Sequence, residues 1–539
     1  MEKRLQHEGE DVQPVVRFTC RVLAGVIAAG LGFGLLGAPA ANATQAAAES
    51  TVKPVNSTIT IVTSGWGHGI GMSQYGAYGA AKAGLSFTQI LNFYYPGTTQ
   101  AKLSASEKID VLISKANDEK LYFYPASGVT ITDTSGKKKV LPVGTKYTLW
   151  RIHRSGTQRL LYYKNDLGKY VKYDSGLSAT KEWFVSNTKT NTVKLLLPGS
   201  VKRTYRGEMT LRFSGNGAVV VNRVLMEDYL RSVVPAEMPA SWSLEAVKAQ
   251  AVAARSYAAR YKKNLNGKKP YDICDTTSCQ AYTGISVEHA NTDKAIKQTA
   301  GVILKYKDTI AYTMFSSSNG GYSAKGDYPY LVAKADPYDD KMLNQYKLVT
   351  LTTAAIEKKF TTIGKFQSMT FKRDGLGPWG GRVTEVKLTG AKGSKTVSGS
   401  SFKSAFGLRE RLMIALGGLS TNSENYARWA KDKNVNGTIG VPTTSEKVIG
   451  AGLHAQFTGG DLFWTKTTGS KLLSGAILQA YLAEKGPSGK LGWPTSDVGT
   501  IKVVKVSDIK SGVEAYFEKG LITCPSKTAK PAQCVVSYG

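Results

Sequence analysis

The stretch "PAEMPASWSLEAVKAQAVAARSYAARYK", residues 235–262, carries the strongest helix signal of the chain. Ser243 stands at the N-cap position, Glu245 lies in the first turn, and alanines fill the following turns up to a basic end. The stretch therefore predicts a helix over about 243–262. A short segment that holds Glu237 precedes it.

Glu237 is the candidate catalytic residue in this stretch. It lies between Pro235 and Pro239, next to Met238 and close to Trp242. Apolar neighbours keep water away from a carboxyl group and raise its pKa, as a general acid requires. The alternative is an ordinary exposed loop glutamate.

Two basic residues of the predicted helix are candidates for substrate binding. Lys248 and Arg255 are seven residues apart and therefore share one helix face, which would run past Glu237. The alternative is that they only keep an alanine-rich helix solvated.

Glu227 and Asp228 are rival carboxyl groups. They lie inside an apolar run, where they could pair with Arg223 or Arg231.

A glycine-rich stretch, "GWGHGIGMSQYGAYGAAKAG", spans residues 65–84. Its glycines alternate, so they fit no G-x-G-x-x-G register, and no G-K-[ST] follows; nucleotide binding is not indicated. Glycines let backbone N–H groups and the side chains of His68, Ser73 and Gln74 come close to a ligand. We predict that these three bind a neutral polar substrate such as a sugar. A structural turn histidine, a metal ligand and a Ser73 nucleophile are the alternatives.

Helices are predicted on either side of Gly84. Ser73 is a fair N-cap for a helix over about 74–83. Ser86 and Gln89 form a capping box for a second short helix, which the Pro-Gly at 96–97 ends.

Two further loops are candidates. "FSSSNGGYS", 315–323, offers hydroxyl and amide groups, and Ser317 and Asn319 are predicted to bind substrate; an ordinary hairpin turn is the alternative. "YDICDTTSCQAYTG", 271–284, contains Cys274 and Cys279. A disulfide is favoured there over zinc because no histidine lies between the cysteines.

The net charge and the N-terminal segment indicate the cellular compartment of the protein. The 539 residues include 70 Lys and Arg against 40 Asp and Glu, a formal net charge of +30, which attracts polyanions. Residues 1–43 resemble a secretory signal peptide, with basic residues before the apolar run 22–36 and a small-residue cleavage site at 41–43. An uncleaved membrane anchor is the alternative. Export argues against nucleic acid and favours anionic cell-envelope polymers as partners.

Four cysteines remain after the signal segment. Their simplest pairing is local, Cys274 with Cys279 and Cys524 with Cys534, as expected for an exported protein.

The rest of the chain divides by composition. Residues 44–58 and 419–438 are polar and predict linkers, and short β-rich runs fill about 107–222. "IGVPTTSE" at 439–446 returns as "LGWPTSDV" at 491–498, which indicates stacked repeats. We expect repeats over 439–525 and a C-terminal tail over 526–539.

Together the quoted motifs strongly resemble the SpoIID/LytB family over about 60–415, and the tail resembles LGFP repeats. The resemblance implies an α+β fold: a SpoIID-like domain over 59–418 with a β-rich insert at 110–200, followed by a small repeat domain. Sporulation members of the family are lytic transglycosylases that act on peptidoglycan glycan strands stripped of stem peptides.

The resemblance also assigns roles. Glu237 matches the catalytic glutamate of the family's "EMP" motif, and Lys248 and Arg255 match basic positions implicated in activity. His68, Ser73 and Gln74 match its glycine-histidine-glycine segment, although that segment usually comes near the end of the domain.

Zinc-binding members of the family have a histidine beside the second cysteine, where this chain has Ser278. This difference favours the disulfide, and we expect no metal and no cofactor.

The resulting prediction is a secreted, wall-associated lytic transglycosylase. It would cleave the MurNAc–GlcNAc bond of peptidoglycan glycan strands to give 1,6-anhydroMurNAc ends, with Glu237 as general acid and base. The alternative is a non-catalytic wall-binding protein or amidase enhancer of the LytB type, with an amidase as its partner.

Overall fold

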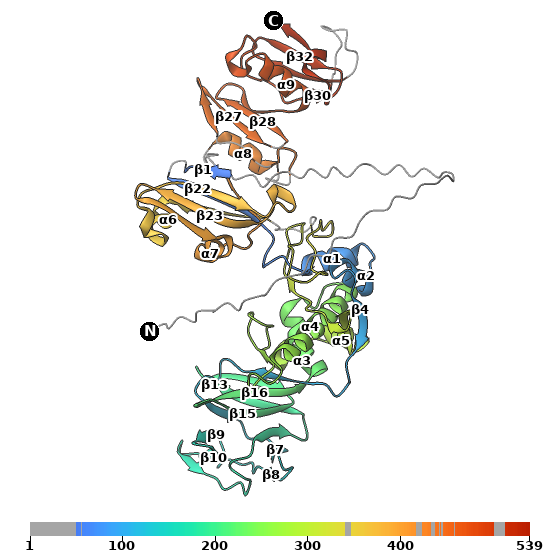
Figure 1. Ribbon diagram of the computed structural model, residues 1–539, viewed down its shortest axis with the longest axis vertical. Coiled ribbons are helices and arrows are strands. Elements are labelled where there is room, and N and C mark those ends of the chain that lie inside the picture. Colours follow the sequence, from blue (N-terminus) through green and yellow to red (C-terminus); the bar gives the residue numbers. More distant parts are fainter. Residues whose placement is uncertain are drawn as a thin grey trace, which may run out of the picture. The chain divides into compact units, whose positions relative to one another are not determined.

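The computed structural model describes residues 50–54, 57–339, 346–416, 423–432, 437–440, 442, 446–457, 459–500 and 512–539. The predicted signal peptide, 1–43, lies outside these residues. No helix in the described part of the chain is both long enough and apolar enough to cross a lipid bilayer. Helices and several sheets alternate through the described chain, which confirms the predicted α+β class (Figure 1).

The helices predicted from the sequence lie in one helical layer of the structure. The predicted helices at 74–83 and 243–262 are both present, and the capping box of Ser86 and Gln89 forms as expected. The helices of this layer are α1 Gln74–Lys82, α2 Phe87–Tyr94, α3 Met226–Glu237, α4 Leu244–Leu265 and α5 Ala290–Gln298.

The β-rich region forms two sheets that share the main hydrophobic core with the helices. In order, the seven-stranded sheet contains β17 Ile273–Cys274, β5 Lys108–Leu112, β16 Gly217–Leu225, β15 Glu208–Ser214, β12 Trp183–Asn187, β7 Val129–Asp133 and β8 Lys138–Val140. The six-stranded sheet contains β11 Tyr170–Lys172, β10 Gln158–Lys164, β9 Leu149–Ser155, β6 Lys120–Phe123, β13 Thr192–Leu197 and β14 Val201–Arg206.

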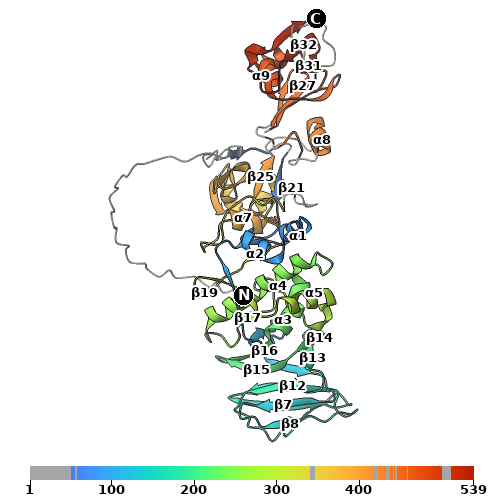
Figure 2. The same cartoon turned by 90° about the vertical axis from the view of Figure 1, so that its right-hand side faces the viewer.

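The insert predicted at 110–200 is therefore not a separate body. Its strands β7, β8 and β12 extend the sheet in which β16 leads directly into α3 (Figure 2). Short strands complete this part of the fold: β19 Thr309–Ile310, β18 Val302–Tyr306 and β4 Thr99–Lys102 form one sheet, and β20 Phe315–Ser316 pairs in parallel with β3 Met72–Ser73.

Residues 346–416 build a second hydrophobic core together with two N-terminal strands. Its sheets are β1 Ser50–Val52, β22 Phe366–Arg373, β23 Val383–Gly390 and β24 Gly393–Ser398, and β21 Tyr346–Thr352, β2 Thr58–Ser64 and β25 Met413–Leu416; its helices are α6 Thr353–Lys359 and α7 Gly399–Ala405. The predicted linker at 44–58 thus contains β1, which pairs with β22.

The C-terminal part repeats one four-stranded unit, as the sequence echo predicted. Pro442 bridges to Phe457 in the first unit, and Pro494 bridges to Phe517 in the second. The units are β26 Lys447–Ile449, β27 Gly452–Phe457, β28 Gly460–Thr465 and β29 Gly469–Leu473, then β30 Gly499–Thr500, β31 Val513–Phe517, β32 Gly520–Cys524 and β33 Val535–Tyr538. Helix α9, Gly475–Ala483, lies between them in sequence.

Two predicted boundaries need correction here. The linker at 419–438 contains helix α8, Glu424–Lys431, whose Trp429 is fully buried against the first repeat unit. The predicted tail at 526–539 supplies β33, which pairs with β32. Both segments are polar in sequence, and single apolar side chains such as Trp429 and Val536 pack into the hydrophobic clusters.

Candidate active site

Glu237 is the last residue of α3. The helix contains Pro235 and is followed by its C-cap residue, Met238, whose backbone is extended and whose side chain is fully buried. The carboxyl group therefore lies at the negative end of the helix dipole, where an ionised carboxylate is disfavoured.

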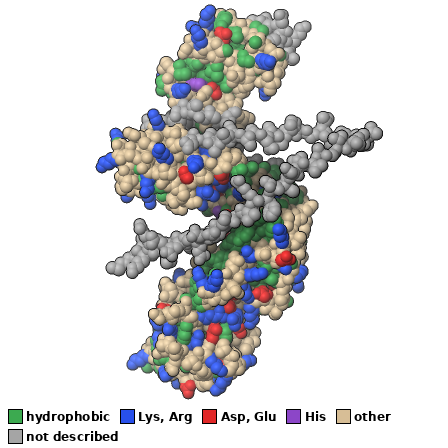
Figure 3. Space-filling model, in the orientation of Figure 1, with side chains coloured by type: hydrophobic (Ala, Val, Ile, Leu, Met, Phe, Trp, Pro, Cys, Tyr) green, Lys and Arg blue, Asp and Glu red, His purple; other side chains and the backbone are tan. Residues whose placement is uncertain are grey.

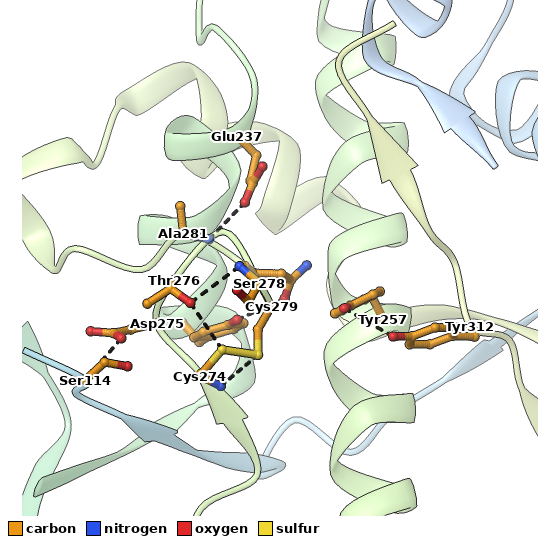
Figure 4. The surroundings of a disulfide bond; sticks show 12 residues. Ser114, Glu237, Tyr257, Cys274, Asp275, Thr276, Ser278, Cys279, Ala281 and Tyr312 are labelled. Atoms are coloured by element: carbon orange, nitrogen blue, oxygen red, sulfur yellow. Dashed lines mark hydrogen bonds between the residues drawn. A yellow bond between two sulfur atoms is a disulfide. The ribbon is translucent and has the colours of Figure 1, made fainter. Parts of the chain in front are cut away.

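The surroundings of Glu237 favour its protonated form. Burial raises the pKa of the carboxyl group, and a single backbone hydrogen bond opposes the increase. In that bond the N–H of Ala281 donates to Oε1 at 2.9 Å (Figure 4). Within the described residues no cationic side chain contributes to the pKa of Glu237. Such a carboxyl group can release a proton at moderate pH and take it back.

Gln280 holds the Ala281 N–H in place. Its amide is fully buried, and its Oε1 accepts a hydrogen bond from the Tyr229 hydroxyl on α3 at 2.9 Å. Its Nε2 donates to the backbone oxygen of Ala254 on α4 at 3.3 Å. The loop that donates to Glu237 is thereby fixed to both helices. A lone glutamine after a cysteine gives no sequence signal for this role.

Tyrosines lie beside the carboxyl group. Burial raises the pKa of the Tyr257 hydroxyl, and the charge of Glu237 adds to the increase. The Tyr312 hydroxyl donates to that of Tyr257 at 3.2 Å, and the rings stack with centroids 4.9 Å apart (Figure 4). Tyr257 and Tyr261 are four residues apart on α4 and also stack. That spacing was the available sequence signal for an aromatic helix face.

The glycine-rich segment lies next to this site despite its early position in the chain. Helix α1 packs on α4, and Tyr78 stacks on Trp242 with centroids 4.6 Å apart. Trp242 lies in the turn that joins Glu237 to α4. The segment also lies beside the serine-rich turn, because Ser317 O accepts hydrogen bonds from the Tyr75 N–H and the Ser73 hydroxyl.

The polar side chains of that segment make hydrogen bonds within the fold. Ser73 is fully buried, and its oxygen caps α1 by accepting from the Gly76 N–H. Gln74 is 6% exposed and donates to Oε1 of Gln250 at 3.4 Å. His68 Nδ1 accepts from the Ile70 N–H at 3.0 Å. Their contacts with a glycan stay predictions.

Burial and the positive charges of Lys403, Arg382 and Arg411 together lower the pKa of His68 to about 4. The imidazole is therefore neutral near pH 7.

The serine-rich turn is anchored by two buried aspartates. The side chain of Asn319, fully buried, donates to Asp336 at 2.7 Å, and its backbone N–H donates to Asp339 at 2.8 Å. Ser318 also donates to Asp339 at 2.8 Å. Ser317 is partly exposed, so its hydroxyl is the more accessible of the two predicted ligands in this turn.

The two basic candidates on α4 are paired with glutamates. Lys248 donates to Glu245 at 2.6 Å, and its side chain is 16% exposed. The Arg255 side chain is 0% exposed, and its guanidinium makes two hydrogen bonds to Glu227. The structure thus brings Lys248, and not Arg255, to a partly exposed position.

The rival carboxylates also have partners. Glu227 pairs with Arg255, so the predicted pairing with Arg223 or Arg231 was wrong for this residue. Asp228 lies 3.9 Å from Arg231, in agreement with the prediction.

Both predicted disulfides form. Cys274 is bonded to Cys279 and Cys524 to Cys534, with Cα–Cα distances of 5.6 and 4.2 Å. The first closes the loop that leads into Gln280 and Ala281 (Figure 4).

Two known family models match parts of this chain. The model of the stage II sporulation protein family, SpoIID, matches residues 214–306, which include α3, Glu237, α4 and the disulfide loop. The LGFP repeat model matches residues 439–489, the first repeat unit and α9. The chain thus carries a SpoIID-type domain followed by an LGFP repeat.

Particular relatives share parts of the chain. A 119-residue segment is 44% identical to the amidase enhancer of Bacillus subtilis (strain 168) and covers 21% of this chain and 16% of that protein. An uncharacterized protein of Brachyspira hyodysenteriae is 37% identical over 24% of this chain and 35% of its own length. Stage II sporulation protein D of Bacillus subtilis is 27% identical over 39% of this chain and 67% of its own length.

Proposed function

We propose that this chain is a peptidoglycan lytic transglycosylase in which Glu237 is both general acid and general base. The observation that supports it is the state of that carboxyl group: it is partly buried at a helix C-terminus, burial raises its pKa, and it accepts a hydrogen bond from the Ala281 N–H. The SpoIID match across this residue agrees with the proposal.

One carboxyl group suffices for the reaction. Protonated Glu237 donates its proton to the oxygen between MurNAc and GlcNAc, the C1–O bond breaks, and an oxocarbenium-like state forms. The carboxylate then takes the proton of the MurNAc 6-hydroxyl, whose oxygen bonds to C1 and closes the 1,6-anhydro ring. No water is consumed, and Glu237 ends protonated, ready for another cycle.

The predicted substrate-binding residues divide by exposure. We propose Lys248 and Ser317 as direct glycan contacts, since their side chains are partly exposed, and Tyr257 and Tyr312 as aromatic surface for sugar rings. His68 is partly exposed as well and is proposed as a further contact. The buried residues are proposed to support this surface from inside the fold: Ser73, Gln74, Arg255 and Asn319.

Muropeptide mass spectrometry tests the proposal. The full chain is incubated with intact and with amidase-stripped glycan, and 1,6-anhydro ends are counted. We expect product from the parent and a loss of at least about a hundredfold in Glu237→Gln, because an amide cannot transfer the proton. Turnover by the parent should fall as pH rises through the raised pKa of Glu237, since the acid form starts the reaction.

Glu208→Gln is the matched control. Glu208 lies on β15 in a surface ion pair with Lys108, and this variant should keep its turnover. Equal product from Glu237→Gln, or no product from the parent with either substrate, contradicts the proposal.

A non-catalytic role is the second candidate, because the relative that is 44% identical is named an amidase enhancer. In that case the parent and Glu237→Gln would both accelerate hydrolysis of wall by a purified amidase, and neither would form anhydro ends. The same two proteins therefore separate the two functions.

We further propose a secreted, envelope-associated location. The signal-like segment at 1–43, the net charge of +30 and the LGFP repeat support it, with anionic wall polymers as partners. A chain that ends near 430 should bind isolated walls less well than the full chain.

A further inference from the structure

The six-stranded sheet has an unusual charge composition. None of its strands, β6, β9, β10, β11, β13 and β14, contains Asp or Glu. The same strands contain these cations: Lys120, Arg151, Arg154, Arg159, Lys164, Lys172, Lys194, Lys202, Arg203 and Arg206. Figure 3 shows Lys and Arg side chains, with some Asp and Glu between them, in the region of these strands.

Tyrosines alternate with cations on the outward face of this sheet. On β10, Leu161 and Tyr163 are buried in the core, whereas Tyr162 between them is partly exposed. Because side chains alternate along a strand, the outward face also carries Arg151 of β9, which is directly opposite Tyr162, and Tyr122 of β6, opposite Arg151.

The outward side chains touch one another across the strands. The guanidinium of Arg151 lies 4.0 Å from the ring centre of Tyr170 and 4.8 Å from that of Tyr162. His153 stacks on Tyr162 with centroids 5.0 Å apart. These contacts hold flat ring surfaces and positive charge in one layer.

The same pattern continues on this face toward the opposite edge of the sheet, at β13 and β14. Lys194 of β13 and Lys202 of β14 lie 5.2 and 5.8 Å from the ring centre of Tyr124, which follows β6. Tyr122 and Tyr162 are two strands apart, or roughly 10 Å, close to the length of two sugar units in an extended chain.

An open cavity of about 430 Å³ borders this face. It is lined by Asn117, Asp118, Glu119, Lys120, His153 and Arg154. Two of its buried polar atoms, Asp118 Oδ1 and His153 Nδ1, have no hydrogen-bond partner in the described structure. The cavity is lined by polar and charged side chains, which can hydrogen-bond to the hydroxyl groups of a ligand.

We propose that this outward face, the insert face, binds an acidic polysaccharide. The apolar C–H side of a sugar ring packs on tyrosine, acid groups on the chain meet the interleaved lysines and arginines, and neutral hydroxyls reach the cavity. The insert face lies on the six-stranded sheet, whereas Glu237 ends helix α3, so this face acts as a second glycan contact of the same molecule.

Binding of defined polymers to the full chain tests this proposal. The probes are polygalacturonate, which has sugar rings and carboxylates, dextran, which has no charge, and polyphosphate, which has charge without sugars. At about 0.1 M salt we expect polygalacturonate to bind, polyphosphate to bind about tenfold more weakly, and dextran not to bind. Equal binding of polyphosphate, or tighter binding of a single-stranded oligonucleotide, overturns it.

Two double variants locate the surface. Lys194→Glu/Lys202→Glu should weaken polygalacturonate binding about tenfold, and both lysines are exposed, so the fold is not at risk. Tyr162→Ala/Tyr170→Ala should weaken it without any change of charge. Lys358→Glu/Lys359→Glu is the matched control, with the same charge change on exposed residues of α6. An equal loss in the control shows nonspecific attraction and refutes the proposal.

Discussion

Replacing Arg255 decides whether this residue holds the fold or contacts the substrate. Its guanidinium is fully buried and makes three hydrogen bonds: Nε to Glu227 Oε1 at 2.9 Å, Nη2 to Glu227 Oε2 at 2.7 Å, and Nη1 to the backbone oxygen of Val302 at 3.0 Å. Arg255→Met keeps most of the volume and removes all three.

The expected cost follows from what is left behind. Breaking a buried ion pair by removing one partner costs about 3–5 kcal/mol, because the remaining charge is uncompensated. The Glu227 side chain is 32% exposed and can regain water, and it keeps a hydrogen bond from the Gly301 N–H. We therefore expect the low end, about 3 kcal/mol, which lowers the melting midpoint of this part of the chain by roughly 5–10 °C.

Calorimetry and circular dichroism on the full chain measure this loss. Lys262→Met is the control, because Lys262 is also a cation of α4 paired with a glutamate but is 37% exposed; it should cost less than about 1 kcal/mol. Arg255→Met/Glu227→Gln should recover part of the loss, since no charge is left without a partner. The reasoning is refuted if Arg255→Met melts like the parent and yet loses glycan turnover.

Two more predictions concern the residues around the site. The pKa of His68 is about 4 in the folded chain, against 6.5 for a free histidine. The free energy of unfolding should therefore be unaffected by His68 above pH 6.5 and should fall as the pH drops from 6.5 toward 4, by on the order of 2 kcal/mol at pH 4.5. His68→Asn keeps an acceptor for the Ile70 N–H and should melt with a smaller difference between pH 7 and pH 4.5; an unchanged difference contradicts the assignment. Cys274→Ser/Cys279→Ser should lose about 2 kcal/mol of stability, as expected for opening a loop with a sequence separation of 5, and should lower turnover by loosening the Ala281 N–H, measured against Cys524→Ser/Cys534→Ser.

Local patterns in the sequence predicted much of the fold. The helix at 244–265, the capping box at Ser86 and the paired bridges of Pro442 and Pro494 each depend on a few adjacent residues or on a repeat. Such signals need no knowledge of what packs where. The position of Glu237 in an apolar setting was also visible, and burial raises its pKa in the structure.

Pairings between distant residues could not be predicted. Arg255 and Glu227 are on different helices, and a basic residue in an alanine-rich run looks the same whether it faces solvent or a buried glutamate. Asn319 likewise has a sequence typical of a turn, and only the fold shows that Asp336 and Asp339 surround it. Strand β1 was missed because three residues of ordinary polarity form a strand only when β22 offers an edge.

The pairings of β2 and β3 with strands far along the chain affect the order in which the chain folds. Thr60 is paired with Leu416, and Met72 with Phe315, so the glycine-rich segment has partners that are synthesised hundreds of residues later. Contacts of such long sequence separation form slowly, after the intervening loop has closed. The parts of the candidate site therefore come together late, and a nascent or truncated chain that lacks residues beyond about 315 carries Glu237 without the serine-rich turn.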